Sequence, residues 1–277
     1  MARNQINYQT IYSQQIYLNS ASAAILLNGS QKSNCTFFFQ DIIKITKDAI
    51  EMRLELVNAQ LPVSWYLINN TNNQFTITIG GVVTNYMFAN GNYNATTFTT
   101  AFETMMGTSW ALAFNSITNK FTIGYSGGQF TLSDTTNSIF TILGFSPANQ
   151  YTSSGNNLLA PYSVCFGGLT KVNILSSSFN LANSDSKTKG QTSTICSVPV
   201  STLQGGYIFY NNITNFKSIF RNHELSSINI QIQDPYNNYI DFNNIDWSLT
   251  LQLDIVREVV QSIDSMDDIY NNLVNEI

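Results

Sequence analysis

The residue types that carry most enzyme chemistry are scarce in this sequence. The chain has 277 residues but a single histidine, His223, which lies in the segment RNHELS. A metal centre in a β-barrel enzyme needs several imidazole ligands, which one histidine cannot supply. We therefore interpret His223 as a structural residue that hydrogen-bonds to Glu224 or to the backbone of a loop, and we expect no metal site.

Three cysteines are the next candidates, because a thiolate can act as a nucleophile when a histidine lies beside it. Cys35, Cys165 and Cys196 are scattered, and their spacing places none of them near His223. Their number is odd, and the first residues contain no signal-peptide core, so we expect no secretory context. We predict buried free thiols rather than a disulfide framework.

Acidic residues and phosphate loops complete the search for catalytic groups. The chain has no GxxxxGK phosphate loop, and the turn at residues 234–241 lacks the oxygen spacing of a calcium loop. A pair of carboxylates for glycoside hydrolysis stays open, although most acids alternate along strand patterns or lie near the C-terminus, where water solvates them. We predict a protein that is not an enzyme and takes no cofactor.

The chain is poor in charged residues. They make up 10% of the sequence, against about 25% in typical soluble domains. Polarity comes instead from neutral side chains, including 35 asparagines, and such surfaces tend to contact other protein. The net charge of −5 without a basic patch argues against a nucleic-acid surface, and no apolar run is long enough to span a membrane.

Two segments near the C-terminus alternate apolar and polar residues. Residues 225–233 read LSSINIQIQ, and residues 246–256 read DWSLTLQLDIV. A period of two places the two sets on opposite faces of a strand, which is typical of antiparallel sheets with one buried face. The stretch between them, DPYNNYIDFNNI, is rich in turn residues. We predict that these segments are the last pair of strands in a β-sandwich.

Outside a central region, the chain holds about eight strand patterns, the number in a jelly roll of two four-stranded sheets. Besides the last two, they are residues 16–27, 35–40, 50–57, 169–179, 194–200 and 207–210. We predict a mainly β fold with a single eight-stranded antiparallel jelly-roll sandwich, spanning residues 14–66 and 165–257. We expect residues 1–13 to be an N-terminal arm and residues 183–190 to be a polar loop.

The sequence pattern changes at residues 67–164, where we predict a small inserted α+β domain with its return loop. One internal helix is expected after Asn94, which can cap the free N–H groups of a first turn, and it should stop at Gly107. Its apolar residues recur at helical spacing, which indicates a core stripe rather than a cofactor site: Phe98, Ala101, Phe102, Met105 and Met106. Short strands are expected at residues 75–79, 82–88, 111–114, 120–125 and 130–133.

Residues 258–277 predict a C-terminal amphipathic arm, a short acidic helix outside the sandwich. Apolar residues recur there at spacings of three and four, among five carboxylates and no Lys or Arg. The helix either packs on its own domain or docks on a neighbouring subunit. In the second case the candidate subunit contacts are Ile263, Met266, Tyr270 and Leu273.

The C-terminal strands resemble the end of the penton (minor capsid) proteins of virophages and of related polinton-like and large DNA viruses. Residues 221–228, the turn at Asp234 and residues 239–249 (YIDFNNIDWSL) resemble the loop, strand, turn and IDFNG-DWS strand of that family. Asn244 stands where a glycine is common, which can alter the turn. Weaker similarities lie at residues 91–93, 143–145 and 197–200, so the resemblance covers roughly residues 40–256.

The resemblance implies a structural capsid protein of the virion. In that family a single jelly roll forms homopentamers at the five-fold vertices of an icosahedral capsid and contacts trimers of the major capsid protein and other minor capsid proteins. The family's inserted domain projects outward, where it is available to a host receptor. Synthesis in the host cytoplasm is expected. The length of the chain agrees with a single jelly roll, because a double jelly roll needs about sixteen strands of five or six residues each.

A receptor- or carbohydrate-binding jelly-roll module is the alternative. It rests on aromatic and Asn-rich loops in the insertion, such as Tyr86, Asn92 and Tyr93. One vertex protein can combine both roles. An enzyme is the reading with the least support.

Overall fold

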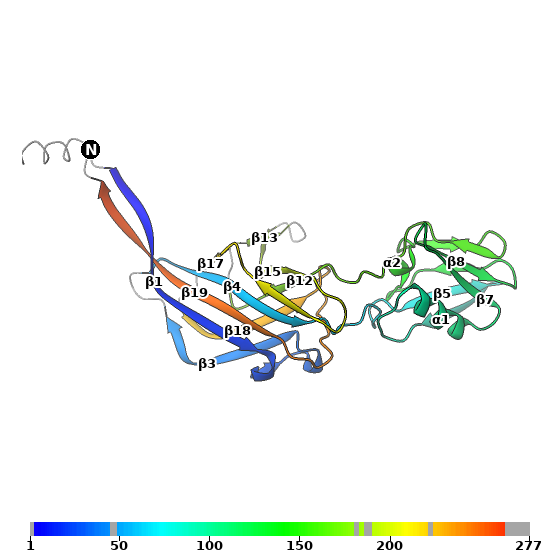
Figure 1. Ribbon diagram of the computed structural model, residues 1–277, viewed down its shortest axis with the longest axis horizontal. Helices are drawn as coiled ribbons and strands as arrows, with labels where there is room; N and C mark the ends of the chain where they lie inside the picture. Colours follow the sequence, from blue (N-terminus) through cyan, green and yellow to red (C-terminus); the bar gives the residue numbers. More distant parts are fainter. Residues whose placement is uncertain (1–2, 45–48, 180–182, 186–189, 221–223, 264–277) are drawn as a thin grey trace, which may run out of the picture. The chain divides into compact units, whose positions relative to one another are not determined.

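The computed structural model describes residues 3–44, 49–179, 183–185, 190–220 and 224–263 (Figure 1). The chain is mainly β, and its named strands all pair antiparallel. It divides into two compact units, which we call unit 1 (residues 1–64 and 171–277) and unit 2 (residues 65–170).

Unit 1 contains two large sheets whose strands interleave in sequence, an arrangement consistent with a jelly-roll-type fold. The first sheet has the order β1 (Arg3–Asn19), β19 (Ser248–Ile263), β4 (Glu51–Pro62) and β16 (Tyr207–Asn211), with β17 (Ser218–Phe220) also pairing with β4. The second sheet has the order β15 (Thr194–Pro199), β12 (Lys171–Leu175), β18 (Glu224–Gln233), β3 (Asn34–Lys44) and β2 (Ile25–Leu26).

Alternating apolar residues bring one face of each sheet into the core of unit 1. In the first sheet Leu251 lies opposite Leu56 and Leu253 lies opposite Leu54, and all four are buried. The second sheet contributes the isoleucines of β18 together with Val172 and Ile174, all fully buried. The sequence alternation therefore predicted the inward residues correctly.

Ring contacts join the two sheets across this core. Phe37 of β3 lies edge-on to Trp247, just before β19, with ring centroids 6.2 Å apart. Phe179, after β12, meets Phe220 of β17 at 4.9 Å. Such edge-to-face pairs are favourable beyond the area that they bury. The two sheets thus share one core, with β18 and β19 on opposite sides of it.

The last two strands do not hydrogen-bond to each other, contrary to their prediction as a pair. β18 pairs with β3 and β12, whereas β19 pairs with β1 and β4. Alternation identifies which residues of a strand are buried, but it carries no information on the neighbouring strand. The neighbours of β18 and β19 are therefore set by the fold of the whole unit, and the alternation could not predict them.

Both predicted arms are strand where the structure describes them. β1 starts at Arg3, and its first residues pair with the end of β19, from Arg3 opposite Ile263 to Thr10 opposite Val256. The predictions of a separate arm at residues 1–13 and of a helix starting at residue 258 were therefore wrong over these residues. The ladder between two strands satisfies the backbone groups, and β-branched residues such as Val256 and Val259 favour extended backbone. Residues 264–277 lie outside the described residues.

Two short features of unit 1 were missed in the sequence. The predicted polar loop at residues 183–190 contains one strand, β13 (Asn183–Asp185), and ends on another, β14 (Gly190–Thr192), which pair as a hairpin. β17 has three residues, too few for a periodic pattern. Single-turn helices η1 (Ser20–Ser22) and η2 (Gly29–Gln31) flank β2.

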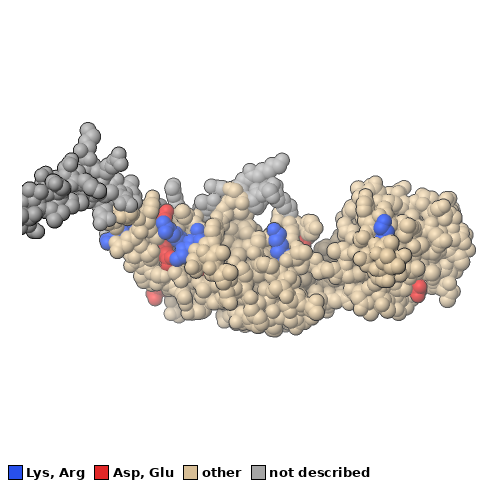
Figure 2. Space-filling view, turned by 45° about the horizontal axis from the view of Figure 1, so that its top comes forward, with Lys and Arg blue, Asp and Glu red and all other residues tan. Residues whose placement is uncertain are grey.

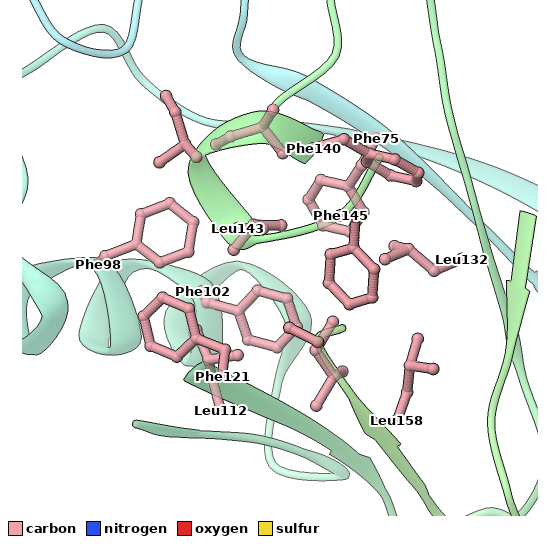
Figure 3. Packing of buried hydrophobic residues seen from close by; sticks show 14 of the residues in the cluster. Phe75, Phe98, Phe102, Leu112, Phe121, Leu132, Phe140, Leu143, Phe145 and Leu158 are labelled. Carbon is pink, nitrogen blue, oxygen red and sulfur yellow. The ribbon is translucent and has the colours of Figure 1, made fainter. Parts of the chain in front are cut away.

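Unit 2 has two sheets and two helices around its own core (Figure 3). One sheet is ordered β10 (Gln150–Thr152), β9 (Thr131–Ser133), β5 (Gln74–Ile79), β6 (Val82–Met87), and the other β11 (Asn157–Leu159), β8 (Lys120–Tyr125), β7 (Trp110–Asn115). The helices are α1 (Ala95–Met106) and α2 (Phe140–Leu143). β10, β11 and α2 were not predicted.

The α1 helix matches its sequence prediction at both ends. The Asn94 side chain accepts from the backbone N–H of Thr97, and the Thr97 side chain accepts from the N–H of Asn94, which completes a capping box. Gly107 ends the helix with φ 82°. Phe98 and Phe102 are fully buried, and Figure 3 shows them beside Phe121 within the core of unit 2.

Candidate assembly surface

The described residues offer no centre for catalysis by a metal ion. No group of three or more His, Cys, Asp or Glu side chains that could hold an ion occurs among them. His223, the single imidazole, lies outside the described residues. No helix in the described part of the chain is long and apolar enough to cross a membrane.

The three cysteines have three different environments. Cys35 is buried, and burial raises the pKa of its thiol to about 12. Cys196 on β15 is half-buried and donates to the Tyr210 hydroxyl on β16 (3.3 Å), a contact between the edge strands of the two sheets. Cys165 is exposed, so the prediction of buried thiols was wrong for that residue.

These environments predict the order of alkylation. Iodoacetamide at mildly alkaline pH is expected to label Cys165 in the folded protein and to spare Cys35, because alkylation requires an accessible thiolate. Mass spectrometry of proteolytic peptides, with the protein in denaturant as the control, measures the rates. Equal labelling of Cys35 and Cys165 in the folded protein would contradict this prediction.

An ion cluster lies on the outer face of the first sheet, the face that points away from the core of unit 1. It comprises Lys217, Asp254 and Glu55, and the lysine Nζ lies 2.5 Å from Asp254 Oδ2 and 3.6 Å from Glu55 Oε2. Ser13 donates to Asp254 and Asn212 donates to Glu55. Only 4% and 7% of the two carboxylate side chains are exposed, so their charge is largely withdrawn from water.

The cluster shifts the acid–base balance of its members. Burial alone would raise the pKa of Asp254, but hydrogen bonds from Lys217, Ser13 and Gln252 outweigh it and hold the pKa below its ordinary value. The hydrogen bond to Asp254 raises the pKa of Lys217, against the opposing effect of burial. Both groups are therefore charged over the physiological pH range.

Exposed apolar side chains lie on the same outer face as the ion cluster. Strand alternation places Tyr17, Phe209 and Ile219 there, and Ile213 and Phe216 are exposed in the loop between β16 and β17. Tyr17 is 75% and Phe209 is 68% exposed. Exposed apolar groups gathered on one face are typical of a surface that meets other protein.

The outer face of the second sheet is a ladder of neutral amides. Asn229 donates through its amide to Asn34 (2.9 Å) and Thr36 (3.1 Å), and it accepts from Gln231 (3.0 Å). Ser177 also donates to Asn229. The polar groups of this face bond to one another instead of carrying charge. Figure 2 shows a largely uncharged surface on the face in view, with Lys, Arg, Asp and Glu at a few separate places.

The predicted site residues fall in different places. Among the candidate subunit contacts, Ile263 ends β19, and Met266, Tyr270 and Leu273 lie outside the described residues. The aromatic residues of the insertion that were candidates for ligand binding pack against other rings of unit 2. Tyr86 stacks on Phe75 at 5.4 Å, and Tyr93 packs edge-on to Phe98 at 5.9 Å.

Asn92 has a comparable structural role in unit 2. Its side-chain oxygen accepts from the N–H of Leu67 at 2.8 Å. Tyr86, Asn92 and Tyr93, the residues that motivated a carbohydrate-binding module, thus make contacts within unit 2, and Tyr86 lies on β6 and not in a loop. The ion cluster, by contrast, was missed in the sequence, because it needs β1, β4, β19 and the loop at residues 212–217 to come together.

Comparison with known proteins gives similarity in structure and none in sequence. No protein-family model and no curated protein matches the chain. The mavirus penton protein is similar, with a TM-score of 0.45 and 14% identity over 90% of this chain and 100% of that protein. A chain of the Sputnik virophage structure has a TM-score of 0.40 and 10% identity, covering 87% of this chain and 97% of its own length.

Proposed function

We propose that this protein is a structural capsid protein that forms homopentameric pentons at the five-fold vertices of an icosahedral virion. The order of the strands in unit 1 is the observation that carries the proposal. Numbered along the chain, the eight principal strands are β1, β3, β4, β12, β15, β16, β18 and β19. Their sheets then run 1-8-3-6 and 2-7-4-5, the connectivity of two Greek keys in one jelly roll. The resemblance at residues 221–249 points to the same class.

A single roll suits a vertex and not a hexon-like position. A double jelly roll needs about sixteen strands, and unit 1 has two large sheets of five strands each in its described residues. Five copies of one roll can close a ring through a heterologous interface, in which two different patches of the same chain meet. The outer face of the first sheet, where exposed apolar side chains accompany the ion cluster, supplies surface for such contacts, both to copies and to trimers of the major capsid protein.

The assembled mass tests this proposal. Native mass spectrometry of the purified protein at micromolar concentration is expected to give a species of five times the 30.9 kDa chain mass. The same protein should co-purify with virus particles. A monodisperse monomer that never associates with particles would overturn the proposal.

A further inference from the structure

The outer edge of β1 leaves a row of backbone groups without a partner strand. Among the described strands β1 pairs with β19 alone. The N–H of Ser20 donates to the carbonyl of Trp247 at 3.0 Å, and backbone groups alternate in direction along an antiparallel strand. The groups of Gln14, Ile16 and Leu18 therefore face β19. Those of the odd-numbered residues 13, 15, 17 and 19 point away from the sheet.

This edge lacks the features that usually prevent strand pairing. Natural edge strands are short, carry Lys or Pro, or are bulged along their length. β1 has 17 residues, no proline, no charged residue after Arg3, and one register shift, between Thr10 and Tyr12. Ser13, Gln15 and Tyr17 are exposed. Beyond β4 the strand continues as a two-stranded ribbon with β19, and such ribbons are marginally stable in water without a third strand.

The edge formed by β16, at the opposite end of the same sheet, also has backbone groups that point outward. The N–H of Asn212 donates to the carbonyl of Val57 at 2.9 Å, so the backbone groups of Tyr207, Phe209 and Asn211 point away from β4. β16 is also uncharged, and its odd-numbered aromatic residues, Tyr207 and Phe209, are exposed on the same outer face as Tyr17. Neither edge carries a charge that would repel the other.

Strand direction decides how two copies can join. Along the path β1, β19, β4, β16 the four strands alternate in direction, so β1 and β16 at its two ends run in opposite senses. When a second copy is added by rotation about an axis along the strands, its β1 lies antiparallel to β16 of the first copy. The outer faces of the two first sheets then lie on the same side of the joined sheet. An even number of strands thus permits a ring in which every junction is an ordinary antiparallel ladder.

We propose that the outer edge of β1, from Ser13 to Asn19, pairs with the β16 edge of a second copy of this chain, so that the first sheets of neighbouring subunits form one continuous sheet. This inference rests on the proposed homopentamer and adds its interface. It is a β-augmentation between copies, in which main-chain hydrogen bonds supply the contact.

Hydrogen exchange resolved to single residues tests the interface in the unmodified oligomer. The amides of Gln15, Tyr17 and Phe209 point outward, and those of Gln14 and Ile16 serve as internal controls because they bond to β19. With the edges paired, the outward amides should exchange as slowly as the controls. Outward amides that exchange roughly 100-fold faster than the controls, in a sample of five-fold mass, would overturn the interface and leave the proposed function standing.

Proline substitution at neighbouring positions provides an independent test. Gln15→Pro removes an outward N–H, which an edge strand tolerates, whereas the matched control Gln14→Pro removes an N–H of the β19 ladder. Gln15→Pro should keep the circular dichroism spectrum of the natural protein but lose the five-fold mass, whereas Gln14→Pro should have a lower Tm than Gln15→Pro. A Gln15→Pro protein that keeps the five-fold mass would overturn the interface. If that variant fails to fold, hydrogen exchange in the natural protein decides.

Discussion

Replacement of Trp247 by alanine is expected to lower the free energy of unfolding by about 4 kcal/mol, the cost of removing a large aromatic side chain from a packed core. Trp247 is 1% exposed and lies edge-on to Phe37 of the facing sheet. Its indole N–H donates to the carbonyl of Lys32 at 2.6 Å. The substitution therefore removes an inter-sheet contact and one of the two hydrogen bonds that the Lys32 carbonyl accepts. Urea denaturation followed by circular dichroism measures the change.

Trp247→Phe is the control, because it keeps an aromatic ring and loses the indole donor. Its cost should be smaller than that of Trp247→Ala by at least about 1 kcal/mol, since most of the apolar volume remains. If the free energy of unfolding of Trp247→Ala lay within about 1 kcal/mol of that of the natural protein, the two sheets could not share the core that their ring contacts indicate.

Replacement of Lys217 by methionine is expected to cost about 3 kcal/mol at neutral pH. The variant leaves Asp254 and Glu55 buried on the outer face with their cation removed, and an unpaired buried charge is strongly destabilising. The estimate lies at the low end of the usual range because 29% of the Lys217 side chain is exposed, so water screens part of the interaction. Lys171→Met, at an exposed lysine, is the matched control and should change stability by less than about 0.5 kcal/mol.

The pH dependence of the Lys217→Met effect follows from the directions of the pKa shifts. The folded-state pKa of Asp254 is lowered, so its stabilisation is present above the ordinary value of 3.8 and is lost as pH falls through the folded-state pKa. The pKa of Lys217 is raised, so its stabilisation is present below 10.5 and is lost as pH rises through the folded-state pKa. Unfolding curves across this range should show the variant approaching the natural protein in acid, where Asp254 is protonated. A difference that stays constant from neutral to acid pH would contradict the role of the ion cluster.

Local patterns predicted local structure well. The alternation LSSINIQIQ matched β18, and the pair Asn94 and Gly107 marked both ends of α1, because capping and strand alternation depend on residues close in sequence. The apolar spacing after Arg257 fitted a helix, but β1 was available as a partner strand for residues 258–263, and tertiary pairing overrode the local pattern.

Long-range features could not be predicted from the sequence. Placing β18 and β19 in different sheets requires knowing the neighbours of each strand, which alternation does not encode. Lys217 and Asp254 are 37 residues apart, and Ser13 and Asp254 are 241 apart, so the ion cluster had no local signal. The strand patterns predict solvated acids at these positions, whereas residues of the loop after β16 bond to Glu55 and Asp254 and help to bury them.

The position of β19 between β1 and β4 has a consequence for biosynthesis. The first and third principal strands leave the ribosome early, yet the strand that lies between them is the last of the eight to be made. Until β19 has been made, the sheet has a vacant centre, and the apolar residues of β1 and β4 are exposed to water. Folding of unit 1 thus waits for β19 and depends on contacts of high sequence separation, which makes it slow and prone to aggregation.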